Sequence, residues 1–302
     1  TLGDIVAARL GGLDRRQREA VEVLAVSGAV PLALIEGLVD PDVLEALERD
    51  GLVRLTHPAR SATVDLAHPL HGEVVRQNLP ALARLRISRL LVQAATGGDQ
   101  VTSVEPLRVA QWLVAAGLTD AGVAPEVLED LAHRALAVGD TRLAAALATA
   151  AFDLGDAVAP ALMAAWCRTE QGDHDGAQTL LAVADERAAA AGMGHMERAA
   201  VRLEWASARW WATQETAAAS ALLDPSLAAG GDAAALARAQ LAIFDALDGR
   251  LRAAITGATP LVDHPNDLVA AVAAAALGPA LAVADRPVEA RTVATVGFDR
   301  AM

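Results

Sequence analysis

The sequence of 302 residues contains no lysine, no tyrosine and a single cysteine, Cys167. Because all 25 basic residues are arginine, a phosphate-binding loop ending in Gly-Lys-Ser/Thr, a Schiff base and a lysine general base are excluded. One cysteine excludes an internal disulfide and any zinc cluster built from cysteines, which fits a reducing, cytoplasmic compartment. Gly-x-Ser-x-Gly, His-Glu-x-x-His and Gly-x-Gly-x-x-Gly motifs are also absent. We therefore expect that this chain is not an enzyme.

Aromatic residues are scarce, with three Phe and five Trp, whereas 54% of the residues are hydrophobic. The abundance of alanine and leucine favours helices, since alanine loses no side-chain entropy on entering one. The length predicts two domains. The longest uncharged apolar run, 268–284, is rich in alanine and interrupted by Gly278-Pro279, so we predict a buried helical hairpin there and no membrane span. Because the chain begins with Thr1, we expect a segment of a longer protein.

The first eighty residues show the pattern of a winged helix, three helices followed by a β-hairpin. The expected elements are helices near 14–28, 32–38 and 40–51 and strands at 52–56 and 63–66, joined by a turn at 57–61. Asp14 and Asp40 are suitable N-cap residues, and Pro41 suits the first helical position. Gly28 and Gly51 are suitable helix ends. Residues 1–80 are therefore predicted to form a small winged-helix domain.

The third helix of this module is acidic, which argues against DNA binding. It carries Asp42, Glu45, Glu48 and Asp50 against a single Arg49. Residues 1–80 hold 12 acidic side chains and 8 arginines, a net charge of −4, and the whole chain has a net charge of −13. Carboxylates repel a phosphate backbone. We therefore expect no direct nucleic-acid binding, and favour a module that packs within its own protein.

His68 lies between the second predicted strand and the helix that follows it. That helix is expected to begin at Pro69 and to bury Leu70, Val74, Val75 and Leu79. A helix N-terminus offers unpaired N–H groups and a partial positive charge, and an imidazole there can donate a further hydrogen bond to a phosphate. The alternative is a histidine that only caps the helix or fills space. His71 lies three residues on, but two histidines without a third ligand predict no metal site.

These residues carry a resemblance to a known family. The stretch at 66–75, Leu-Ala-His-Pro-Leu-His-Gly-Glu-Val-Val, follows the acidic module and precedes Leu-Pro-Ala-Leu-Ala-Arg-Leu-Arg-Ile-Ser-Arg-Leu-Leu at 79–91. Together they resemble the LuxR-type large ATP-binding transcription regulators, the MalT-like members of the STAND class of signalling ATPases. The sequence resemblance covers about the first hundred residues, and the rest of the chain resembles the family in its architecture only.

The resemblance implies a larger protein with an ATPase core upstream of this chain and a DNA-binding helix-turn-helix downstream. It implies ADP or ATP as the nucleotide of the full-length protein and no cofactor in this fragment. His68 matches the family histidine that touches the β-phosphate of bound ADP. One departure is that Pro69 follows His68 where many relatives have aspartate.

The remaining residues, 81–302, are predicted to form a tetratricopeptide-like α-solenoid. A glycine or aspartate in a break between helices is followed five residues later by alanine. The pairs are Gly139 and Ala144, Gly172 and Ala177, Asp248 and Ala253, and Asp285 and Ala290, with other breaks at 96–99, 230–232 and 257. The spacing is near the ~34-residue period of such repeats. One more unit is expected around a turn near 211–213.

Solenoids often bind ligands on a concave surface, and the best candidate for this surface is Arg202, Trp205 and Arg209. Their i, i+3, i+7 spacing puts them on one helix face. Two guanidinium groups beside an indole can hold a sugar ring or a peptide carboxylate. The alternative is a tryptophan packed under its arginines between helices.

The leading hypothesis is a regulatory and sensor segment of an ATP-dependent transcription regulator. A small-molecule or protein effector would bind the repeats and shift the nucleotide-gated switch in the winged-helix module. The alternative is a stand-alone helical-repeat scaffold that recruits other proteins.

Overall fold

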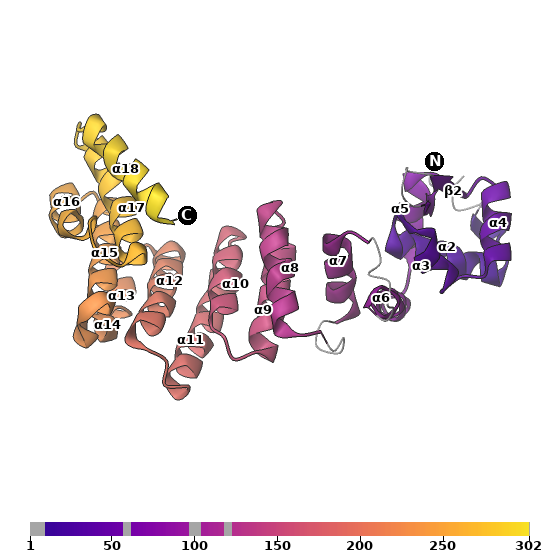
Figure 1. The fold of residues 1–302 in the computed structure, drawn as a ribbon, viewed down its shortest axis with the longest axis horizontal. Helices are drawn as coiled ribbons and strands as arrows, with labels where there is room; N and C mark the ends of the chain where they lie inside the picture. Colours follow the sequence, from indigo (N-terminus) through magenta and orange to yellow (C-terminus); the bar gives the residue numbers. More distant parts are fainter. Residues whose placement is uncertain (1–9, 57–61, 97–103, 118–122, 302) are drawn as a thin grey trace. The chain divides into compact units, whose positions relative to one another are not determined.

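Figure 1 shows the computed structural model, which describes residues 10–56, 62–96, 104–117 and 123–301. The chain divides into two compact units, Thr1–Gly155 and Asp156–Met302. Apart from three short strands in the first unit, the regular structure of the described ranges is helical, and within each unit the helices pack on one another in succession. The all-α fold class is confirmed. The predicted boundary after residue 80 lies inside the first unit and stays a prediction.

The first unit begins with the predicted helices and hairpin strands in the predicted order, together with one further strand, β1. They are α2 (Arg15–Ser27), β1 (Val30–Pro31), α3 (Leu32–Glu36), α4 (Pro41–Arg49), β2 (Val53–Thr56), β3 (Thr63–Leu66) and α5 (Pro69–Asn78). Asp14 caps α2 by accepting the Gln17 N–H at 2.8 Å, and the Gln17 side chain accepts the Asp14 N–H at 3.1 Å. Asp40 caps α4 by accepting the Asp42 N–H at 3.0 Å. Both predicted helix starts are confirmed.

The strands form an antiparallel sheet in the order β1-β3-β2. β2 and β3 pair as the expected hairpin, with Val53 opposite Leu66. β1 pairs with the other edge of β3, with Val30 opposite Val64. This strand escapes prediction because two residues are too few to show the alternation that identifies a strand. The turn predicted at 57–61 lies outside the described residues.

The buried face of α5 differs in part from the predicted one. His71, Gly72 and Leu79 are buried, whereas Leu70, Val74 and Val75 are only half-buried. The helix packs against α2 and β3. At this contact Gly72 faces Leu66 of β3, since a Cβ added to Gly72 would lie 3.4 Å from the Leu66 Cδ1 atom, an ordinary van der Waals distance. A pattern of apolar residues does not reveal a contact made through glycine.

The rest of the first unit is two helix pairs. They are α6 (Ala81–Thr96) with α7 (Pro106–Ala116) and α8 (Pro125–Ala137) with α9 (Thr141–Leu154), and α7 contacts both helices of the second pair. Of the break predicted at 96–99, only residue 96, the last of α6, lies within the described residues. Arg108 Nη1 of α7 donates to the Ser27 carbonyl at the end of α2, and Arg76 Nη1 of α5 donates to the Ala25 carbonyl of α2, each at 3.0 Å. Cations suit the unpaired carbonyls of a helix C-terminus.

The second unit continues the pattern of paired helices. Its helices are α10 (Ala159–Glu170), α11 (His174–Ala190), α12 (His195–Thr213), α13 (Thr216–Ala221), α14 (Asp224–Ala229), α15 (Gly231–Leu247), α16 (Leu251–Ala258), the 3-10 helix η2 (Thr259–Leu261), α17 (Asp267–Val283) and α18 (Pro287–Ala301). The turn predicted near 211–213 follows α12, where Gln214 has a φ of 57°. Gly257, predicted as a break, lies inside α16, one residue before its end.

The repeated turn has one physical form. A residue with positive φ stands five residues before a buried alanine. The pairs are Gly139 (φ 82°) and Ala144, Gly172 (80°) and Ala177, Gly249 (76°) and Ala254, and Asp285 (59°) and Ala290. The third pair corrects the predicted Asp248 and Ala253, since Ala253 is exposed. Gly249, and not Asp248, adopts the left-handed conformation that the turn requires.

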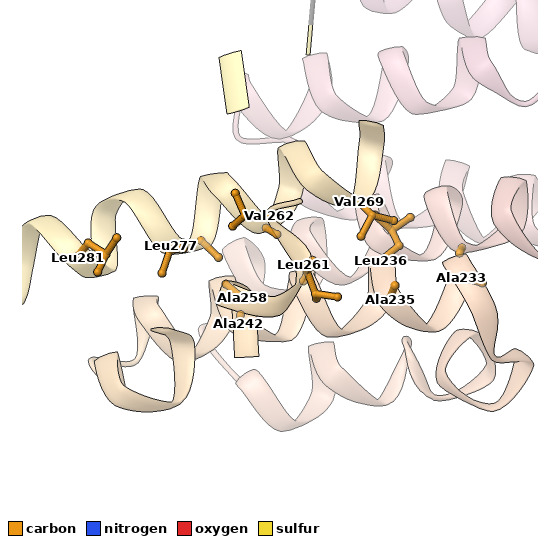
Figure 2. Packing of buried hydrophobic residues seen from close by; sticks show 14 of the residues in the cluster. Ala233, Ala235, Leu236, Ala242, Ala258, Leu261, Val262, Val269, Leu277 and Leu281 are labelled. Atoms are coloured by element: carbon orange, nitrogen blue, oxygen red, sulfur yellow. The ribbon is translucent and has the colours of Figure 1, made fainter. Parts of the chain in front are cut away.

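α17 is one continuous helix and not the predicted hairpin. Pro279 lies inside it, although an interior proline costs about 3 kcal/mol. Helices α15, α16 and α18 all pack against α17, and Figure 2 shows its Val269, Leu277 and Leu281 in one apolar cluster with Leu236 of α15. This burial outweighs the cost of the proline. No helix in the described ranges is long and apolar enough to cross a membrane.

Candidate functional site

His68 lies at the N-cap of α5, directly after the hairpin. Its backbone is extended, and its Nδ1 atom accepts the Leu70 N–H at 3.2 Å. A neutral imidazole that accepts at Nδ1 carries its proton on Nε2. The residue is exposed, so the His68 ring can be reached from solvent. The capping role that was the sequence-based alternative is present, and the phosphate contact stays a prediction.

The backbone of the first turn of α5 has little capacity left for an anion. Pro69 has no N–H, the Leu70 N–H is bound by the His68 ring, and the His71 N–H donates to the His68 carbonyl at 3.0 Å. An anion at this helix end would therefore be bound through the His68 ring and not through free backbone donors.

His71 lies beneath this end of the helix and is 6% exposed. The centroids of the His68 and His71 rings are 5.8 Å apart, with the ring planes tilted by 50°. Across the described ranges, no three or more His, Cys, Asp or Glu side chains are grouped in a way that could hold a metal ion.

Arg202, the first residue of the predicted effector site, is engaged within the second unit. Its Nε lies 3.2 Å from Oδ1 of Asp185 on α11, and its Nη2 donates to Oδ2 at 3.2 Å. Arg198, one turn earlier on α12, approaches the same carboxylate at 3.7 Å. The Arg202 and Asp185 side chains are 11% and 18% exposed. The two arginines thus clamp one carboxylate and hold α11 against α12.

Trp205 and Arg209 continue the same face of α12. Trp205 is half-buried, and Arg209 Nη1 donates to the Gln178 Oε1 atom of α11 at 3.4 Å. The spacing correctly predicts that Arg202 and Arg209 share a face, but both arginines reach the neighbouring helix. This geometry matches the packing alternative, and effector binding by these residues stays a prediction.

Glu204 is an unusual group that the sequence pattern does not single out. Burial raises the pKa of the Glu204 carboxyl to about 7, and none of the described residues forms an ion pair or hydrogen bond with its side chain. Its α12 neighbours Val201 and Ala208 are fully buried. Their i, i+3, i+7 spacing from Val201 through Glu204 to Ala208 is the signal that could have found it. A carboxyl with this pKa changes charge near neutral pH.

A distant structural neighbour is found among the solved structures. It is a crystal structure of a Signal Transduction ATPase with Numerous Domains (STAND) protein with a tetratricopeptide repeat sensor from Pyrococcus horikoshii, 12% identical with a TM-score of 0.39. The alignment covers 99% of this chain and 53% of that protein, so this chain spans about half the length of the neighbour. Neither a family model nor a curated protein matches the sequence.

Proposed function

We propose that this chain is the regulatory and sensor segment of a multidomain ATP-dependent transcription regulator of the LuxR-type, STAND class. In this proposal residues 1–80 are a winged-helix module that contacts the ATPase core, and residues 81–302 are a tetratricopeptide-like sensor. An effector bound by the sensor shifts the switch only if it binds one state more tightly than the other. The segment itself carries no catalytic group and does not bind nucleic acid.

The observation that carries the proposal is the order of elements along the chain. Three helices and a hairpin are followed by His68 at the N-cap of α5, and then by successive helix pairs. That order, together with the residues around His68, is what the family resemblance implies. In this proposal the Nε2–H of the exposed His68 residue donates to a β-phosphate presented by a neighbouring domain.

The test separates the two roles of His68 in the full-length protein. His68→Ala removes both the cap and the Nε2–H donor, whereas His68→Asn keeps an acceptor for the Leu70 N–H. We expect both variants to retain about tenfold less ADP after purification, since a hydrogen bond to a charged group contributes about 1.5–3 kcal/mol. His133→Ala, at an exposed histidine of α8, is the control. Full ADP retention in both His68 variants would refute the phosphate role.

A stand-alone interaction scaffold is the second candidate, and one observation favours it. A groove of about 580 Å³ lies between α17 and α18, lined mainly by alanine and glycine with the exposed ring of Phe298. Such an apolar surface suits protein contacts. The gene on either side decides between the two: a phosphate-binding loop upstream and a helix-turn-helix downstream support the switch, and stop codons support the scaffold.

A further inference from the structure

A second groove lies in the first unit, between α3, α4 and the sheet. Its volume is about 250 Å³, and its apolar lining includes Leu44 of α4 and Val53, Leu55 and Val64 of the hairpin. Clefts that hold metabolites or drug-sized ligands measure roughly 300–1,000 Å³. This groove is smaller and suits a single anchoring side chain of a partner, the kind of contact that dominates binding energy in protein interfaces.

Three exposed carboxylates line the same groove, Glu36 of α3 and Glu45 and Glu48 of α4. None of the three side chains forms an ion pair or hydrogen bond with a residue in the described part of the chain. Arg49 lies one turn after Glu45, but no ion pair joins them. We call this groove, defined by these carboxylates and its apolar lining, the acidic groove; it carries three negative charges that no residue of the described ranges pairs with.

The charge decides which class of partner fits. Nucleic acids and anionic membrane surfaces are repelled by carboxylates, whereas arginine and lysine side chains pair with them. We propose that the acidic groove binds a basic amphipathic segment of a partner protein. One apolar side chain of that segment enters between α4 and the sheet, and its flanking cations pair with Glu36, Glu45 and Glu48.

This proposal assigns a binding role to α4, whose acidic residues select a cationic partner. Under the proposed winged-helix assignment, α4 corresponds to the helix that enters the major groove in winged helices that bind DNA. Here the acidic groove selects a cationic protein in place of a polyanion. The inference does not depend on the ATP-regulated switch, because a scaffold would use the same groove.

The test begins with a phage-displayed library of short random peptides selected on this protein. We expect enriched peptides to combine arginine or lysine with one aromatic or aliphatic residue. The binding of a synthetic peptide with the most enriched sequence to this protein is then measured by fluorescence polarisation. The triple variant Glu36→Gln, Glu45→Gln, Glu48→Gln is expected to weaken binding at least tenfold. The control triple variant Glu126→Gln, Glu170→Gln, Glu186→Gln removes the same charge from exposed residues elsewhere and should bind like the parent.

The apolar half of the groove has its own variants. Leu32 of α3 also lines the groove. Leu55→Ser and Leu32→Gln are both expected to weaken peptide binding at least tenfold, and thermal unfolding identifies any variant that fails to fold. Raising the salt from about 50 to about 300 mM should weaken binding further, because exposed charge pairs are screened. The proposal is overturned if no basic peptide is selected, if the charge and apolar variants bind like the parent, or if a short DNA duplex binds through this groove.

Discussion

Replacing Glu204 with glutamine is expected to stabilise the second unit above pH 7 and to have little effect near pH 4.5. Burial raises the pKa of this carboxyl from its ordinary 4.5 to about 7, so the folded chain binds the proton more tightly than the unfolded chain. The resulting stabilisation is fully present below pH 4.5 and is lost as the pH rises through about 7. Each pH unit corresponds to about 1.4 kcal/mol, so the loss is about 3 kcal/mol at most.

The assay is urea unfolding followed by tryptophan fluorescence, at several pH values from about 4.5 to about 8. Trp166, Trp205, Trp210 and Trp211 all lie in the second unit, so the signal reports mainly on that unit. Glutamine stays neutral, and the difference between parent and variant isolates this one carboxyl from the other titrating groups. The control Glu186→Gln, at an exposed residue of the adjoining α11, should follow the parent. If the parent and Glu204→Gln curves stay parallel across the range, the raised pKa is wrong.

Two other predictions concern packing in the second unit, both measured by urea unfolding. Gly297→Ala should destabilise the fold by about 1–3 kcal/mol, because the added Cβ would overlap the Ala274 Cβ of α17. In contrast, the Cβ added by Gly257→Ala in α16 would lie at an ordinary 3.6 Å from the Ala242 Cβ, and this variant should stabilise the fold by about 0.5–1 kcal/mol. If both variants changed the free energy of unfolding in the same direction, the close-contact argument would be wrong. Arg202→Ala should cost about 2 kcal/mol by leaving Asp185 with its more distant partner Arg198. An equal loss in Arg198→Ala would show that the shorter contact is not the stronger one.

Much of the fold could be predicted because helix ends depend on a few neighbouring residues. Asp14, Asp40 and His68 each accept an N–H within three residues along the chain, so the signal for a cap is local in the sequence. The alternation in the two longer strands is equally local. These features place the helix starts and the hairpin without knowledge of what packs on them.

Other features could not be predicted because they depend on residues that are remote in the sequence. Pro279 lies in a helix that α15, α16 and α18 pack against, and this packing stabilises α17 despite the proline. The candidate effector site shows the same limit. An i, i+3, i+7 pattern places Arg202 and Arg209 on one face, but it does not tell whether that face meets solvent or another helix. Asp185, 17 residues before Arg202, decides this.

The turn conformation repeats along the chain even where the residue at the turn changes from glycine to aspartate. Each turn needs one residue in the left-handed conformation and a small residue five positions later, and no other identity is required. Glycine meets the first need most easily, but Asp285 also meets it, because aspartate enters this region more readily than most residues. A search by residue identity finds both Asp248 with Ala253 and Gly249 with Ala254, and only the positive φ of Gly249 identifies the second pair as the turn. Backbone conformation, and not the aspartate or glycine itself, is the property that repeats along this chain.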